Sequence, residues 1–234
     1  MIAAMAAEHS SPPAAVFLDA LGTLVRFENP SPALVRLLHE RHAIDVSLTD
    51  ARRAMLAEID YYRRACTLAG DARTLAELRL ECARIVRGEL SLPASAISDK
   101  QLVAALLDAL HFEPYDDVRA ALRRWRADGL TLVVVSNWDI SLRDVLGVTG
   151  LRDLVDGVVC SADVGRAKPD PAVFHAALDI VGLPPERVVH IGDGLVEDVA
   201  GARAAGIEPI LLRRGEAAPE APVGVRVIAS LREW

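Results

Sequence analysis

The sequence predicts an α/β protein with a Rossmann-like, doubly wound parallel sheet and an all-helical segment inserted after the first strand. Two observations support this fold class. From about residue 115 onward, short apolar runs alternate with amphipathic helical stretches, a pattern typical of a parallel sheet with right-handed crossovers. Residues 26 to 112 are instead rich in Ala, Leu, Arg and Glu, with no strand-like run, which indicates several helices.

Six apolar runs have the length and composition of buried strands. They are Ala14–Leu18, Leu130–Val135, Gly157–Cys160, Val188–Ile191, Pro209–Leu212 and Val225–Ile228. Helices are predicted between them at Asp116–Ala127, Pro171–Val181 and Val196–Ala205. In the first of these, Val118, Ala121, Leu122 and Trp125 recur at the spacing of one helix face.

These elements divide the chain into three parts. A disordered tail is expected over residues 1–13, a core domain over 14–25 and 113–234, and a helical cap domain over 26–112. Within the cap segment, turn-forming residues predict breaks between helices near Asn29-Pro30, Ile44–Thr49, Ala69–Asp71 and Ser91–Ser98.

Composition narrows the classes of function. The 234 residues carry a formal net charge of −7, which argues against a nucleic-acid surface because such surfaces are basic. The three cysteines are widely spaced and odd in number, so we expect buried free thiols in a reducing compartment. No apolar run is long enough to span a membrane, and residues 1–14 make a poor signal peptide. We therefore expect a cytoplasmic protein, a monomer or homodimer, with a small anionic molecule as its partner.

Four polar clusters follow predicted strands, where ligands bind in sheets of this type. They are Asp19–Leu24, Ser136–Asp139, Lys168–Pro171 and Gly192–Asp198. Each alone is compatible with a turn or a helix start. Their convergence on one edge of one sheet indicates a functional site. Lys168 carries extra weight because the chain has only one other lysine, Lys100.

In order and spacing, these clusters resemble the motifs of the haloacid dehalogenase-like hydrolase superfamily, from residue 14 to residue 231. The helical segment after the first cluster is similar to the C1-type cap of subfamily I. The resemblance implies a covalent mechanism in which Asp19 is the nucleophile and Lys168 stabilises charge. It further implies that Thr23 and Ser136, with Asn137 nearby, bind the phosphate.

The same resemblance implies a magnesium site. Asp19, the backbone carbonyl of Leu21 and Asp193 would be its ligands, with Asp198 behind them orienting Lys168 or metal-bound water. Mg²⁺ suits such a site because it prefers hard oxygen donors. A carboxylate can attack an anionic phosphate only where cations offset their repulsion, and a metal ion and Lys168 would supply them.

The chain departs from the family pattern at Leu21. Family phosphatases have at this position an aspartate that protonates the leaving group, and such a residue contributes about 10²–10⁴-fold to rate. The leading prediction is a magnesium-dependent hydrolase of a small phosphorylated metabolite with weakened acid–base catalysis. Two alternatives stay open, a haloacid dehalogenase-like C–halogen hydrolase and a non-catalytic phosphate- or metabolite-binding protein. Dehalogenases of this family have tyrosines where this chain has Leu21 and Phe174.

The cap segment is expected to select the substrate. Its most suggestive stretch is Tyr61, Tyr62, Arg63 and Arg64, where arginines and tyrosine hydroxyls are suited to an anionic ligand. The favoured interpretation is nevertheless a helix with one buried aromatic face and solvated arginines. Lys100 is expected to be a surface residue.

Overall fold

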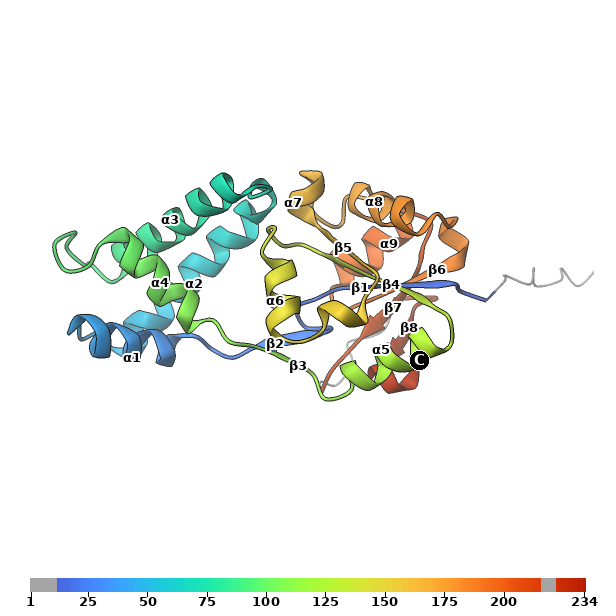
Figure 1. The fold of residues 1–234 in the computed structure, drawn as a ribbon, viewed down its shortest axis with the longest axis horizontal. Helices are drawn as coiled ribbons and strands as arrows, with labels where there is room; N and C mark the ends of the chain where they lie inside the picture. Colours follow the sequence, from blue (N-terminus) through green and yellow to red (C-terminus); the bar gives the residue numbers. More distant parts are fainter. Residues whose placement is uncertain (1–11, 216–221) are drawn as a thin grey trace, which may run out of the picture.

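A computed structural model describes residues 12–215 and 222–234 (Figure 1). The predicted tail, residues 1–13, lies outside the described residues apart from Pro12 and Pro13. Among the described residues, one sheet has six parallel strands in the spatial order β5-β4-β1-β6-β7-β8. The strands are β1 (Ala15–Leu18), β4 (Thr131–Ser136), β5 (Gly157–Cys160), β6 (Val188–Gly192), β7 (Glu208–Leu212) and β8 (Arg226–Ile228). Each boundary lies within one residue of the predicted one, which confirms the fold class.

The strands are recognisable in the sequence because both faces of the sheet are buried. All four residues of β1 are fully buried, so its sequence reads as a continuous apolar run rather than an alternating one. Val16 and Leu18 pack on one side of the sheet with α5 (Val118–Ala127) and α6 (Leu142–Val148).

Ala15 and Phe17 pack on the other side of the sheet with α8 (Ala172–Val181) and α9 (Gly201–Ala204). Figure 1 shows α5 and α8 on opposite sides of the sheet. A short helix, α7 (Ser161–Val164), follows β5. The predicted helix Val196–Ala205 begins with a π-helical turn, η4 (Leu195–Ala200), before α9. The remaining single turns are η1 (Cys66–Leu68), η2 (Arg152–Leu154), η3 (Pro185–Arg187) and η5 (Leu231–Glu233).

Four helices form an insert between strands β2 (Val25–Phe27) and β3 (Phe112–Pro114), and we call it the helical insert. They are α1 (Ser31–His42), α2 (Leu48–Ala65), α3 (Ala72–Glu89) and α4 (Asp99–Ala109). The helices begin where the sequence supplies capping side chains: Ser47 accepts a hydrogen bond from Asp50, and Asp71 and Ser98 form capping boxes. The insert has an apolar core of its own, drawn from all four helices, and the breaks between helices lie where the sequence predicts them.

A two-stranded antiparallel ribbon joins the insert to the rest of the molecule, and the sequence analysis missed it. Strand β2 (Val25–Phe27) pairs with β3 (Phe112–Pro114), with Phe27 opposite Phe112. Three-residue strands are too short to show an alternating pattern, which explains why no strand was expected at the ends of this segment.

The described residues include no helix that is both long enough and apolar enough to cross a membrane. The three cysteines, Cys66, Cys82 and Cys160, are free and buried, as predicted.

Candidate active site

The predicted site residues meet at the carboxyl edge of the sheet because β1 lies between β4 and β6. Asp19 follows β1, Ser136 ends β4 and Asp193 follows β6. Lys168 lies in the loop between α7 and α8. Strand order therefore brings together clusters that are far apart in the chain.

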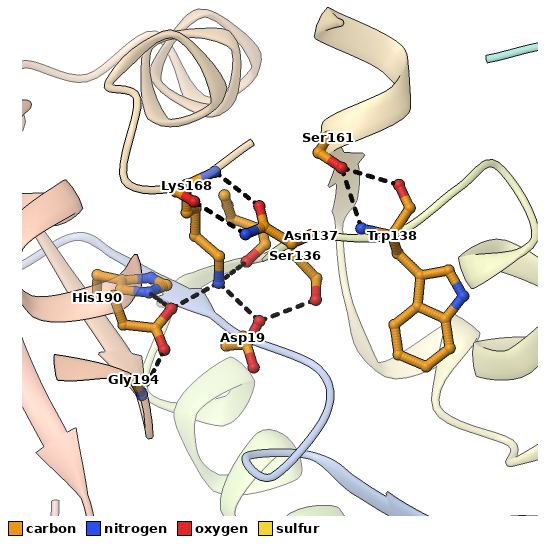
Figure 2. A network of polar contacts seen from close by, with 10 residues as sticks. Asp19, Ser136, Asn137, Trp138, Ser161, Lys168, His190 and Gly194 are labelled. Carbon is orange, nitrogen blue, oxygen red and sulfur yellow. Dashed lines mark hydrogen bonds and ion pairs between the residues drawn. The ribbon is translucent and has the colours of Figure 1, made fainter. Parts of the chain in front are cut away.

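Asp19 is held by two donors on one of its two carboxylate oxygens. Ser136 Oγ donates to Asp19 Oδ1 at 2.8 Å, and Lys168 Nζ donates to the same oxygen at 2.6 Å (Figure 2). Within the described ranges, no hydrogen bond reaches Oδ2. Burial raises the pKa of Asp19, although Lys168 opposes this shift. The carboxylate is therefore fixed through one oxygen, and the other is available.

Lys168 is a buried cation with three acceptors. Besides Asp19, its Nζ donates to Asp198 Oδ1 at 2.5 Å and to the carbonyl oxygen of Val135 at 3.0 Å. Burial alone would lower the pKa of Lys168, but the two carboxylates outweigh it and raise the pKa. The ammonium therefore stays charged and immobile beside Asp19.

Asp198 uses both carboxylate oxygens to hold this lysine and the loop after β6. His190 Nε2 lies 2.9 Å from Oδ1, and the Gly194 backbone N–H donates to Oδ2 at 2.8 Å. Burial would raise the pKa of Asp198, but Lys168 and His190 lower it. A Cβ at residue 192 would lie 2.2 Å from Asp198 Cγ, so only glycine fits there. These contacts support the predicted role of Asp198 behind the reacting groups.

Asn137 lines the cavity, and its side-chain amide is hydrogen-bonded to the backbone of Lys168. Its Nδ2 donates to the Lys168 carbonyl at 3.0 Å, and its Oδ1 accepts from the Lys168 backbone N–H at 2.7 Å. These two hydrogen bonds position the backbone of Lys168, and they leave the second N–H of the amide without a partner among the described residues. The phosphate-binding role of Asn137 stays a prediction.

Three carboxylates are close enough together to hold a cation. One oxygen from each of Asp19, Asp193 and Asp198 lies within 4.8 Å of the others. Burial, together with the charges of Asp19 and Asp198, raises the pKa of Asp193 to about 6. Gly22 has a φ of +85°, and a Cβ there would lie 2.1 Å from Asp193 Oδ2. The loop after β1 is thus packed directly against Asp193, and this crowded set of hard oxygen donors fits Mg²⁺.

Thr23 and Leu21 lie in the same loop. Thr23 is fully buried, and its hydroxyl oxygen has no hydrogen-bond partner among the residues described. A buried hydroxyl without a partner is costly. Thr23 is not among the residues that line the cavity, so its contact with a phosphate oxygen stays a prediction. Leu21 forms an isolated bridge with Val25, and its side chain packs on the main core. No ionisable side chain therefore occupies the position of the family's acid.

A cavity of about 810 Å³ separates this edge from the helical insert. Asp19, Ser136, Lys168 and Asp193 line it from the core side, while α2, α3 and α4 line the opposite side. The predicted reacting groups therefore line one side of the cavity, and the helical insert lines the other.

The model of the haloacid dehalogenase-like hydrolase family matches residues 13–206. The chain belongs to this family. The match covers the sheet edge, the helical insert and all the predicted site residues.

Two curated relatives have local similarity to this family member. Haloacid dehalogenase-like hydrolase domain-containing protein 3 of Bos taurus is 37% identical over 126 residues, or 50% of each chain. Phosphoserine phosphatase of Thermus thermophilus is 37% identical over 117 residues, or 47% of each chain. The chain thus spans about half the length of the curated relatives it matches.

Among solved structures, a defluorinating L-2-haloacid dehalogenase has a TM-score of 0.72 at 20% identity, covering 94% of this chain and 92% of that one. At this level of identity, the likeness shows the shared fold alone.

Two residues of this family member make contacts that the sequence analysis missed. His190 is fully buried, touching Asp198 and lying edge-on to Phe174. The signal was a single imidazole within an otherwise apolar strand. Tyr62 of α2 donates a hydrogen bond from its hydroxyl to Asp139 Oδ2 at 2.9 Å, which joins the helical insert to the loop after β4. No spacing rule connects these two residues, since 77 positions separate them.

The stretch from Tyr61 to Arg64 only partly follows the favoured interpretation. Both tyrosines pack against apolar clusters, and Arg64 forms an exposed ion pair with Asp60. Arg63, however, lines the cavity. Lys100 is exposed, as expected.

Proposed function

We propose that this protein is a magnesium-dependent phosphohydrolase in which Asp19 is the covalent nucleophile, acting on a small phosphorylated metabolite. The observation that carries the proposal is the arrangement of Asp19. One carboxylate oxygen is held by Ser136 and Lys168, the other accepts no hydrogen bond from a described residue, and Asp19 lines a cavity together with Asp193. In this proposal, residues 26–112 form the cap, and residues 14–25 and 113–234 form the core.

Asp19 would attack the phosphorus atom, forming an acyl phosphate as the bond to the leaving oxygen breaks. Water would then hydrolyse the acyl phosphate and release inorganic phosphate. Two steps replace one harder step. Lys168 would balance the charge on the transferring oxygens, and the hydroxyl of Thr23 would donate to them. The hydroxyl of Ser136, whose one proton is donated to Asp19 in this structure, would turn from Asp19 to the phosphate when the substrate binds. Asp198, His190 and Asn137 would keep Lys168 in place.

Asp19, the Leu21 carbonyl and Asp193 would hold Mg²⁺, which when bound offsets the repulsion between the nucleophile and an anionic substrate. Asp193 is the better of the two remaining carboxylates for this role. Both oxygens of Asp198 are already engaged by Lys168, His190 and Gly194.

Leu21 limits the substrates that the enzyme can process. Without a carboxyl at this position, the leaving oxygen receives no proton from the loop after β1. Phosphates whose leaving group departs as a stable anion would therefore react best.

Leu21 also keeps a second candidate function open, because halide departs from a haloacid without a proton. Phe174 argues against that reading. It lacks a hydroxyl group and is fully buried against His190, away from the cavity. The phosphatase name of the Thermus relative is consistent with the first candidate.

The test is a comparison of nitrophenyl phosphate, acetyl phosphate and chloropropionate, each with Mg²⁺ and with a chelator, on wild type and Asp19→Asn. We expect phosphate release that needs both Mg²⁺ and Asp19. Halide release in the presence of chelator would overturn the proposal in favour of a dehalogenase. Binding without turnover of any substrate would favour the non-catalytic alternative.

A further inference from the structure

The wall of the cavity formed by the helical insert carries two arginines that the proposed chemistry does not use. Arg63 of α2 and Arg79 of α3 both line the cavity. Each follows a residue of one shared apolar cluster, since Tyr62 packs against the cluster that contains Leu78. The two guanidinium groups therefore come from neighbouring positions on adjacent helices.

These arginines differ from most others on the same two helices. Ion pairs with carboxylates are formed by Arg53, Arg64, Arg73, Arg84 and Arg87, and none of these lines the cavity. Within the part of the chain that is described, Arg63 and Arg79 form no ion pair and donate no side-chain hydrogen bond. Their positive charges are therefore available to an anionic ligand in the cavity.

The other charges of the cavity sharpen this contrast. Lys168 is the remaining cation in its lining, and Asp19 and Asp198 already engage it. Glu58 lies on the same wall of the insert, and the other acidic residues of the lining are Asp139, Asp144, Asp193 and Glu197. Among the described residues that line the cavity, Arg63 and Arg79 are therefore the cations available to an anionic group that binds away from the sheet edge.

We propose that Arg63 and Arg79 form a subsite for a second anionic group of the substrate, at the end remote from the phosphate. This inference rests on the proposed function, because the phosphate is placed at Asp19 and Lys168. Arginine suits the task because its planar, always charged guanidinium pairs with carboxylate or phosphate oxygens through two parallel hydrogen bonds. The substrate class would be phosphate monoesters whose carbon skeleton ends in a carboxylate or a second phosphate. Monoesters with a neutral tail would bind less tightly.

The test is calorimetric binding of non-hydrolysable phosphonates to the Mg²⁺-loaded protein. The probes share an alkyl chain and differ in the tail: butylphosphonate is neutral, phosphonobutyrate anionic and aminobutylphosphonate cationic. A bisphosphonate of similar length separates a preference for phosphate from one for carboxylate. Phosphonoacetate and phosphonohexanoate vary the reach. We expect the best anionic tail to bind at least about tenfold more tightly than the neutral tail, a factor that one ion-paired contact can supply.

Arg63→Gln, Arg79→Gln and the double variant should lose this preference while still binding butylphosphonate. Arg64→Gln and Arg73→Gln are matched controls, because they remove exposed, ion-paired arginines from the same helices, and both should keep it. If wild type binds neutral or cationic tails as tightly as anionic ones, or if the controls lose as much as the test variants, the subsite is wrong and the proposed function stands. If no phosphonate binds whatever its tail, the phosphate site fails as well.

Discussion

The charged side chains at the carboxyl edge of the sheet have several hydrogen-bond partners, whereas two arginines on the facing side of the helical insert have none among the described residues. At the edge, Lys168 is buried with three acceptors, and Asp198 is engaged on both oxygens. On the insert, Arg63 and Arg79 face the cavity without an ion pair among the described residues. In the proposed function, the fixed charges of the edge would stabilise the transferring phosphoryl group. The two arginines of the insert would pair with the second anionic group of the substrate.

The largest effect that would test this comparison is on folding stability. Lys168→Met should lower the free energy of unfolding by about 3–5 kcal/mol at neutral pH, because Asp19 and Asp198 would stay buried without their shared cation. Urea denaturation measures this loss. Lys100→Met is the matched control, since it removes the only other lysine, which is exposed, and should change stability by less than about 0.5 kcal/mol. Equal changes in the two variants would mean that the edge is not held by Lys168.

The proposed Mg²⁺ site assigns different roles to Asp193, a direct ligand, and Asp198, which supports the site from behind. Asp193→Asn should weaken Mg²⁺ binding by more than about 100-fold, because it neutralises a direct ligand. Asp198→Asn should weaken it by roughly tenfold, the lower end for a residue that supports a ligand from behind. Calorimetric titration of both variants with Mg²⁺ compares them directly. Equal losses, or a larger loss for Asp198→Asn, would contradict the assignment.

Leu21→Asp should accelerate hydrolysis of alkyl phosphates by up to about 100-fold, because it restores a proton donor near the leaving oxygen. Nitrophenyl phosphate should gain little, since its leaving group departs without a proton. Steady-state rates on this pair of substrates measure the difference. A folded, metal-binding variant that gains on neither substrate would show that a missing acid is not what limits the enzyme.

The smallest expected effect concerns the contact between insert and edge. Tyr62→Phe should lower the free energy of unfolding by about 1–2 kcal/mol, because Asp139 loses one of its hydrogen bonds. Tyr61→Phe is the control, since Tyr61 makes no side-chain hydrogen bond within the described ranges. Thermal or urea unfolding of both variants would decide, and a loss no greater in Tyr62→Phe would contradict the role of this contact.

The sheet could be predicted from the sequence because each of its strands is buried on both faces. Such strands appear as apolar runs, and those of β1, β4 and β6 end in the polar residues that build the site. Because the carboxyl ends of parallel strands lie at one edge of a sheet, the sequence was enough to predict Asp19, Ser136 and Asp193 at the same edge. The position of β1 between β4 and β6, and the contacts of Lys168 with Asp19 and Asp198, come from the structure alone.

The remaining contacts depend on the three-dimensional arrangement of the chain, which the pattern of apolar and polar residues does not show. The ribbon of β2 and β3 is too short for a pattern, and the Asn137 amide could be placed only once the Lys168 backbone was known to lie beside it. The contact between Tyr62 and Asp139 depends on how the helical insert sits against the core. The sequence therefore predicts which residues lie at the edge of the sheet better than it predicts how the helical insert contacts that edge.

The β2–β3 ribbon has a consequence for how the protein can be altered. Its pairing holds Arg26 beside Glu113, 87 positions apart in the chain, so the helical insert is a loop closed at its base. The entropic cost of closing a loop grows only slowly with its length, and the insert has its own apolar core. We therefore expect that the helical insert, residues 28–111, can be lengthened, shortened or exchanged while β1 and α5 keep their places. Such a change would remove the hydrogen bond between Tyr62 and Asp139 and alter the side of the cavity that faces Asp19.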